Sequence, residues 1–484
     1  MSVARAGRGR AGGGRSGGLG ASAPLLAANL LEAALPFVRN VALARLIAPG
    51  EFGLAISLAV VIGLVEVLTD FGLPIFAVRK TSAVPHAAMM GTLQSLALLR
   101  AALLGLAIAA TAPWTARLFG AADGAGVYAL LGAVVLLRGF ENFGVKEMMA
   151  RCVFWREAVV VIGAQVAGLA VAVAAAALTA SFACMAWGML ATTAATVVLS
   201  HLLSPLPYRL RWDRAAAAEA SAFGRPLLVN GAAAALGMGD RVLVGAVLGP
   251  APLALYNVAY GTATLPRTVL ARFLTSAFLP LFVARRETGR RGPELFDTWA
   301  WCLSCLALAY GLALSLVGDR ALALVFGAAY QPSRLFMCLA GLSVCVKLLM
   351  LLPVPEAYAS GNTRLVATGS ILSALSVVPG AALLLWRHDV ELFLAGLVAA
   401  EFVALLAFIG RAMREQAFTR EAAWLAVAVP FLLLAVLAAL TVLLPGMTFA
   451  AWLAAGLTAL GVSASIYALM ILRFGIGLRT LFPA

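Results

Sequence analysis

The chain has 484 residues, of which 63% are hydrophobic and 12% are charged, whereas soluble domains are about 45–50% apolar and about 25% charged. Such a mixture cannot form a water-facing surface, so it excludes a soluble enzyme, a disordered protein and a disulfide scaffold. The net charge of +14 suits a polytopic membrane protein, whose basic residues flank helix ends and face anionic lipid, and no nucleic-acid partner is expected.

Apolar stretches follow one another along nearly the whole chain. Residues 1–23 are mostly Gly, Arg, Ser and Ala, and we expect them to form a flexible, basic, cytoplasmic tail. Beyond them the hydropathy predicts an all-α integral membrane protein with about 14 transmembrane helices. The predicted spans are 24–47, 52–73, 89–111, 124–140, 158–179, 183–203, 226–245, 257–281, 298–317, 334–355, 365–386, 391–410, 422–444 and 449–472.

The distribution of basic residues supports this succession of spans. If the N-terminus is cytoplasmic, 24 of the 35 Lys and Arg residues fall in inner segments, four fall in outer segments and seven lie inside spans. Cytoplasmic loops of membrane proteins carry such an excess of cations. The bias therefore predicts a multi-pass protein with both termini in the cytoplasm.

A weak internal repeat predicts two halves. The segment Leu46–Pro49 after the first span corresponds to Val247–Pro250 after the seventh, at an offset of 201 residues or six helices. Halves offset by an even number of spans run parallel and are related by an axis along the membrane normal. We expect an N-lobe of helices 1–6 at 24–205 and a C-lobe of helices 7–12 at 206–421. Helices 13 and 14 and a short cytoplasmic tail would then occupy 422–484.

The segments between the spans carry no sign of catalysis. They are short and contain neither a GxxxxGK[ST] phosphate loop nor an HExxH motif, which argues against ATP hydrolysis and metalloprotease chemistry. Cys302 and Cys305 form a CxxC on an apolar helix without a second pair, so packing is expected for them and not metal binding. We expect no enzyme activity, no cofactor and no metal.

Charges inside the spans are the main functional signal, because each one at the bilayer centre costs at least about 2.5 kcal/mol. Arg267 lies about 15 Å from either end of its span, without an acid on its own helix. The adjacent Pro266 indicates a broken helix of the kind that lines transporter cavities. The cations within spans, which outnumber the acids and so favour an anionic cargo, are Arg39, Arg45, Arg100, Arg241, Arg267, Arg272 and Lys347.

Several motifs resemble one known family in their order and spacing. They are Val38–Leu54, Asp70–Leu73, Asp240–Gly245 with Leu248–Gly249, Tyr256–Ala259, Leu324–Gly327 with Tyr330, and Ala359–Arg364. Together they resemble the polysaccharide-biosynthesis flippases of the Wzx type, in the multidrug/oligosaccharidyl-lipid/polysaccharide (MOP) exporter superfamily. The likeness extends over roughly residues 24–410.

The resemblance implies two pseudo-symmetric six-helix lobes around a cavity, followed in many relatives by two further helices. It implies alternating access that moves a polyprenyl-diphosphate-linked oligosaccharide across the bacterial cytoplasmic (inner) membrane, for O-antigen, exopolysaccharide or capsule. Membrane lipids, a polysaccharide polymerase and export machinery are the implied partners. Coupling to H+ or Na+ is the expected source of energy.

The resemblance also points to particular residues. In related lipid II flippases, cavity arginines on helices 1 and 8 contact the lipid diphosphate, and by position Arg39, Arg45 and Arg267 match them. The predicted diphosphate-binding residues are Arg39, Arg45, Arg267, Arg272 and Lys347. The predicted ion-coupling carboxylates are Glu66, Asp240 and Glu401.

Other functions remain open at this point. A small-molecule antiporter of the MATE type or a lipid II flippase would have the same fold, but a drug-cation exporter would need an acidic cavity. A membrane-embedded glycan polymerase or ligase would carry catalytic residues on the outer face. A scaffold without transport activity would not need arginines within the membrane.

Overall fold

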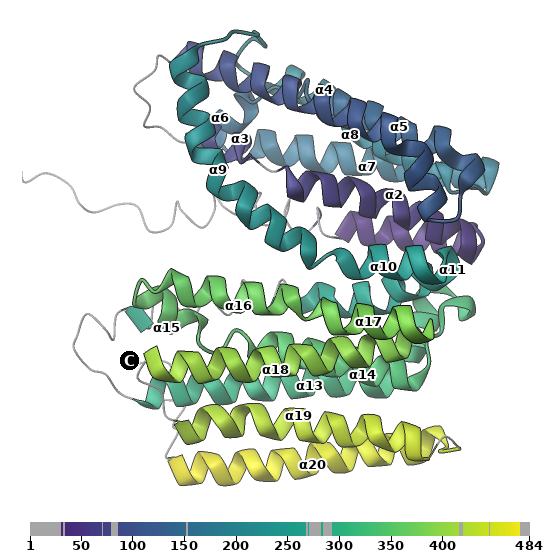
Figure 1. Cartoon of the computed structure of the whole chain (residues 1–484), viewed down its shortest axis with the longest axis vertical. Coiled ribbons are helices and arrows are strands. Elements are labelled where there is room, and N and C mark those ends of the chain that lie inside the picture. The colour runs from purple at the N-terminus through teal and green to yellow at the C-terminus, as the bar shows by residue number, and fades with distance from the viewer. Residues whose placement is uncertain are drawn as a thin grey trace, which may run out of the picture. The chain divides into compact units, whose positions relative to one another are not determined.

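The structure, a computed structural model, describes residues 31, 34–69, 71–78, 86–151, 153–267, 270, 282–283, 293–415, 420–444 and 446–474. Over these residues it contains helices and no strand, which confirms the all-α class (Figure 1). Nine helices in the described part are long and apolar enough to cross a membrane. The total of 14 spans stays a prediction, and the predicted tail 1–23 lies outside the described residues.

The chain forms two compact units. Unit 1 contains residues 1–46, 69–115 and 123–228, and unit 2 contains residues 47–68, 116–122 and 229–484. The first helix of unit 2 therefore comes from the N-terminal part of the sequence. The expected lobes at 24–205 and 206–421 stay predictions.

Unit 1 is built from helices of very different lengths. They are helical residues 34–46, α3 (Leu73–Val78), most of α4 (His86–Leu118), α5 (Ala125–Arg138), α6 (Gly144–Ala150), α7 (Trp155–Thr179), α8 (Ala183–Leu203) and the first part of α9 (Arg214–Leu236). The long α7 and α8 pack against each other, and α5 packs on α8.

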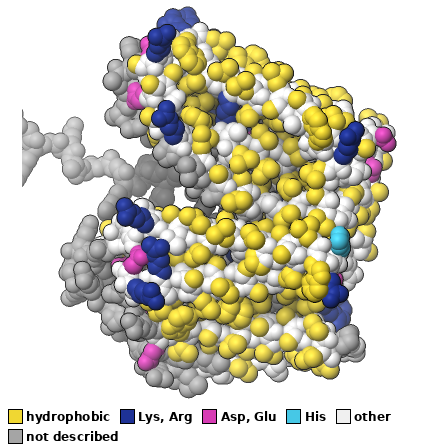
Figure 2. Space-filling model, viewed as in Figure 1, with side chains coloured by type: hydrophobic (Ala, Val, Ile, Leu, Met, Phe, Trp, Pro, Cys, Tyr) yellow, Lys and Arg dark blue, Asp and Glu magenta, His cyan; other side chains and the backbone are white. Residues whose placement is uncertain are grey.

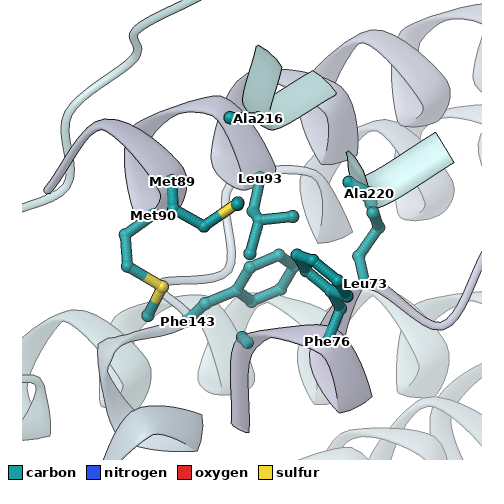
Figure 3. Packing of buried hydrophobic residues seen from close by; sticks show 9 residues of the cluster. Leu73, Phe76, Met89, Met90, Leu93, Phe143, Ala216 and Ala220 are labelled. Carbon is teal, nitrogen blue, oxygen red and sulfur yellow. The ribbon is translucent and has the colours of Figure 1, made fainter. Parts of the chain in front are cut away.

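A hydrophobic cluster joins the short α3 to α4, α9 and the start of α6 (Figure 3). Phe76 and Phe143 are both nearly inaccessible to solvent, and Phe223 packs against the Phe76 ring at 5.2 Å between centroids. The buried members are Leu73, Phe76, Ala77, Met89, Met90, Leu93, Phe143, Ala216 and Ala220. This packing holds four elements of unit 1 together.

Unit 2 begins with α2 (Pro49–Leu68) and ends with a set of long helices. Its other elements are α10 (Gly239–Leu248), α11 (Pro250–Tyr256), the π-helix η2 (Asn257–Gly261), α13 (Pro293–Phe326), α14 (Arg334–Leu349), α15 (Val354–Ala359), α16 (Thr363–Leu375), α17 (Val377–Arg387), α18 (Val390–Glu415), α19 (Arg420–Leu443) and α20 (Phe449–Phe474). Helix α14 packs against α13, α18 and α19. Hydrophobic side chains cover the flanks of these helices, and charged side chains gather at their ends (Figure 2).

Three predicted spans are interrupted, and the sequence explains where. Pro353 and Pro379 lack the N–H groups that would bond to the carbonyls of Leu349 and Leu375, so α14 and α16 end there. The span predicted at 226–245 is divided by a turn between α9 and α10 that contains Gly237. At the break after α14, Trp299 Nε1 donates a 2.8 Å hydrogen bond to the Leu352 carbonyl, which satisfies a backbone group that lipid cannot.

The helices that follow the two segments of the weak repeat, α2 and α11, lie against each other within unit 2. Helix α2 packs against α11, and a Cβ atom on Gly53 would overlap the carbonyl oxygen of Pro250. Small residues allow membrane helices to approach this closely. Only a glycine at position 53 therefore leaves room for the first turn of α11.

We predict that Gly53→Ala destabilises the protein. Overpacking against a backbone carbonyl costs about 1–3 kcal/mol, which outweighs the gain of up to about 1 kcal/mol that alanine brings to a helix. Gly50→Ala is the matched control, because a Cβ atom there meets nothing within 4 Å. In detergent, thermal unfolding should show a lower midpoint for Gly53→Ala and an unchanged or higher midpoint for Gly50→Ala. Equal midpoints for the two variants would contradict the close packing.

Candidate functional site

Four polar side chains form a closed ring inside unit 2. Lys347 Nζ donates a 2.5 Å hydrogen bond to the Tyr260 hydroxyl, and Tyr260 and Ser343 are joined through their hydroxyl groups at 2.8 Å. Ser343 Oγ donates to Glu401 Oε2 at 2.6 Å, so Tyr260 is the donor to Ser343. Glu401 Oε1 closes the ring at 2.9 Å from Lys347 Nζ.

The contact between Lys347 and Glu401 is best described as an ion pair. Glu401 Oε1 has no partner with good hydrogen-bond geometry, although the ammonium lies 2.9 Å away. The Glu401 side chain is 1% exposed and that of Lys347 is 17% exposed. A pair this deeply buried is stable only when both charges are present, because removing one leaves the other uncompensated.

Three elements bring the ring together. Ser343 and Lys347 are four residues apart on α14 and therefore lie on one face, while Glu401 comes from α18. Tyr260 lies in the π-helix η2, and single π-turns inside helices are frequent at functional sites. Lys347 Nζ also lies 5.0 Å from the centre of the Tyr260 ring.

A second carboxylate, Asp240, is held beside this ring. The Tyr256 hydroxyl donates a 2.8 Å hydrogen bond to Asp240 Oδ2, and the backbone N–H of Arg241 donates a 2.8 Å hydrogen bond to Asp240 Oδ1. The rings of Tyr256 and Tyr260 stack with their centroids 5.2 Å apart. This aromatic pair connects Asp240 on one side with the ring of four polar side chains on the other. Both oxygens of Asp240 are thus occupied, and the residue is buried.

Arg267 lies seven residues beyond Tyr260 on the same helical stretch. Its Nε atom is buried without a hydrogen-bond partner, and the guanidinium has no ion pair among the residues that the structure describes. The side chain is half-buried. An arginine inside a membrane span is costly unless it has a counter-ion, water or a ligand.

The remaining predicted residues are not part of the ring. Arg39 and Arg45 lie on the helical residues 34–46 of unit 1, where Arg39 is half-buried with an unpartnered Nε and Arg45 is exposed. Glu66 is half-buried on α2 of unit 2. Arg272 lies outside the described residues. The structure therefore brings together only Lys347 and Glu401, which were predicted for different roles, and places Asp240 beside them.

Sequence reasoning missed the hydroxyl groups of this region. Tyr256 and Tyr260, like Ser343 and Lys347, are separated by four residues, so each pair shares a helix face. Polar side chains four residues apart in an apolar stretch were the sequence signal that could have indicated this polar region. Within the described part of the chain, no group of three or more His, Cys, Asp or Glu side chains is placed to hold a metal ion.

Comparisons with known proteins place this geometry in context. Residues 42–335 match the model of a family described as "Polysaccharide biosynthesis protein". The chain is similar in fold to a multidrug resistance MATE family transporter of the MOP superfamily in an inward-facing conformation, with 14% identity, a TM-score of 0.57, and coverage of 79% of this chain and 95% of that one. A comparison with curated protein sequences gave no significant match.

A second solved structure shares the fold. It is a MOP superfamily transporter from Pyrococcus furiosus, with 14% identity, a TM-score of 0.51, and coverage of 82% of this chain and 95% of that one. A reversed polarity of its binding pocket has been taken to suggest a different function for that protein. At this level of identity the two likenesses establish the fold alone.

We predict that Lys347 and Glu401 depend on each other for stability. Glu401→Leu or Lys347→Met should each destabilise the protein by about 3–5 kcal/mol, because each leaves a buried charge or a broken network. The double variant Lys347→Met/Glu401→Leu should recover much of the loss. Unfolding of the four proteins in mixed detergent micelles measures the coupling free energy, and additive effects of the two substitutions would rule out the ion pair.

Proposed function

Because the chain belongs to the polysaccharide biosynthesis protein family, we propose that it is a flippase that translocates a polyprenyl-diphosphate-linked oligosaccharide across the cytoplasmic membrane. The family match and the MOP-type fold support a multi-pass membrane exporter, and the charges inside its helices support an anionic cargo. The proposed mechanism is alternating access without covalent chemistry. Both termini are proposed to be cytoplasmic, in a bacterial inner membrane.

The observation that carries the proposal is that Arg267 has no ion-pair partner among the described residues. The guanidinium has five N–H donors in a planar fork that matches phosphate oxygens, and here no described carboxylate uses it. Arg39, in unit 1, has the same unpartnered Nε and is the second arginine that we propose to bind diphosphate oxygens. Arg45 and Arg272 are weaker candidates for the same role.

Lys347 is a poorer candidate for direct diphosphate binding than Arg267. Its charge is already balanced by Glu401, and Tyr260 uses one of its three protons. Binding of a phosphate by Lys347 would first have to break the ring. We therefore propose that Lys347 contacts the cargo only when its ion pair with Glu401 is broken.

The paired carboxylates disfavour an exporter of drug cations. Such a carrier needs acids and aromatic faces that are free to bind a cation. Asp240 and Glu401 instead accept hydrogen bonds from Tyr256 and Ser343 within unit 2. The same two carboxylates and Glu66 are the groups through which we propose coupling to H+ or Na+.

A flippase must also shield the head group of its cargo. A glycan with its diphosphate cannot cross hydrocarbon unaided, because the transfer of each polar or charged group from water into hydrocarbon costs several kcal/mol of free energy. A hydrated path lined by a few cations would lower this cost, while the polyprenyl chain stays in lipid. Membrane lipids, a polysaccharide polymerase and export machinery are the proposed partners.

We predict that Arg267→Ala abolishes translocation while the protein still folds and inserts. Removing a charged hydrogen-bond donor from a phosphate contact costs about 1.5–3 kcal/mol, which corresponds to a fall in binding of about 10-fold to 100-fold. Arg267→Lys should retain part of the activity, because it keeps the charge but loses the fork. The measurement is complementation of surface polysaccharide in a strain that lacks the gene.

The matched control is Arg387→Ala. Arg387 is an exposed arginine at the end of α17 that stacks on Trp386 at 4.3 Å. It should complement like the wild type. Normal complementation by Arg267→Ala at equal protein level would show that Arg267 does not bind the diphosphate.

A further inference from the structure

The segment between α8 and α9, residues 204–213, contains no helix and lies against the beginning of α4 within unit 1. We call this segment the strap. Every second residue in its C-terminal half donates its backbone N–H group to α4. The donors, each with its acceptor and distance, are Arg209 (Gln94 Oε1, 3.1 Å), Arg211 (the Gly91 carbonyl, 3.3 Å) and Asp213 (Thr92 Oγ1, 3.0 Å).

The strap approaches α4 most closely at Gly91. A Cβ atom on Gly91 would lie 2.9 Å from the Cβ atom of Arg211 and 3.1 Å from the carbonyl oxygen of Arg209, so a side chain at position 91 would push the strap away. One turn further along α4, the Ser95 hydroxyl donates a 2.8 Å hydrogen bond to the Arg211 carbonyl. The backbone of the strap is therefore fixed in place although it has no regular structure.

The strap has one basic side and one apolar side. Hydrogen bonding through every second N–H group is typical of an extended chain, in which successive side chains point to opposite sides. Arg209 and Arg211 then share one side, and Leu210 and Trp212 share the other. All four residues are exposed, and Leu210 and Trp212 are 51% and 58% exposed.

The positive charge of the strap is not neutralised within the described part of the chain. Arg209, Arg211 and Arg214, the residue after the strap, are exposed and form no ion pair with a described residue. Asp213 is the single acid of the strap. One of its oxygens accepts a 2.9 Å hydrogen bond from the Ala216 N–H group and so caps the start of α9.

The strap lies at the level of a membrane surface. The apolar part of α4, Ala88–Leu118, has 31 residues. It is about 46 Å long, whereas the hydrocarbon core of a bilayer is about 30 Å thick, so the ends of α4 project into the headgroup layers. The strap is bound to one of these ends, and it directly follows the last residue of α8, Leu203, which ends another apolar span.

We infer that the strap is a docking surface for anionic phospholipids of the leaflet at this end of the protein. Arg209, Arg211 and Arg214 bind the lipid phosphates, and Leu210 and Trp212 lie at the boundary of the acyl chains, where tryptophan is enriched. The charge of the arginines is complementary to that of the headgroups. The inference goes beyond the proposed function and takes from it only the orientation, in which this end is cytoplasmic.

The test measures lipid binding by the purified full-length protein in a neutral detergent. Native mass spectrometry gives the affinities for added phosphatidylglycerol, which is anionic, and for phosphatidylcholine, which has no net charge. The variant Arg209→Gln/Arg211→Gln/Arg214→Gln should weaken phosphatidylglycerol binding about tenfold or more, because each cation beside an anionic membrane strengthens binding about fivefold. It should change phosphatidylcholine binding much less.

The matched control removes the same number of charges from unit 2. Arg364→Gln/Arg411→Gln/Arg414→Gln replaces exposed arginines at the start of α16 and the end of α18. It should bind phosphatidylglycerol like the wild type. Equal losses in the two triple variants would show that net charge alone attracts the lipid and would overturn the inference. Unchanged binding by the strap variant, or no preference of the wild type for phosphatidylglycerol, would overturn it as well.

Trp212→Ala tests the apolar side of the strap. It keeps all three arginines, so it should weaken the binding of both lipids by a similar factor and leave the preference for phosphatidylglycerol intact. Unchanged binding of both lipids would contradict the position of Trp212 at the acyl chains.

The outcome is independent of the test of the proposed function. The assay measures lipid binding and not translocation, so failure of the strap variants would leave the flippase proposal standing. Normal complementation by Arg267→Ala would likewise leave the strap as a lipid-binding surface.

Discussion

The cost of placing a charge inside a membrane is the constraint that organises this protein. Each charged group at the bilayer centre costs at least about 2.5 kcal/mol, so an ionised side chain there needs a counter-ion, water or a ligand. Lys347 and Glu401 meet this requirement internally, through a ring that also uses two hydroxyl groups. Arg267 and Arg241 do not, since neither forms an ion pair with a residue that the structure describes. The contrast separates charges that are balanced within the fold from charges that have no counter-ion among the described residues.

The same constraint explains the irregular backbone around these groups. Breaks in membrane helices leave carbonyl and N–H groups that lipid cannot satisfy, so they occur where protein or water can. Trp299 donates a hydrogen bond to the Leu352 carbonyl at one break. The Tyr310 hydroxyl donates a 2.8 Å hydrogen bond to the Ala263 carbonyl just beyond the π-turn. The irregular segments of unit 2 thus coincide with its polar side chains. This is the arrangement expected for a carrier, whose polar path must be stable without a cargo.

The fold class could be predicted from the sequence. A helix satisfies its own backbone hydrogen bonds in lipid, and its side chains must be apolar over the thickness of the bilayer, so each spanning helix shows a long apolar run. Pro353 and Pro379 also indicate where α14 and α16 end. The ring could not be predicted. Tyr260 and Ser343 are 83 residues apart, and Ser343 and Glu401 are 58 apart, so only tertiary packing brings them together. Sequence reasoning gave Lys347 and Glu401 separate roles because it had no information on which helix faces meet.

We propose that this protein moves a lipid-linked oligosaccharide from the inner to the outer leaflet. The most direct measurement is the sidedness of that lipid in cells that lack the gene, by probing which leaflet exposes the glycan to an external glycosidase or lectin. We expect the lipid-linked glycan to accumulate on the cytoplasmic side in these cells and to return to the outer side when the gene is restored. Accumulation on the outer side would instead indicate a polymerase or ligase and would contradict translocation by this protein.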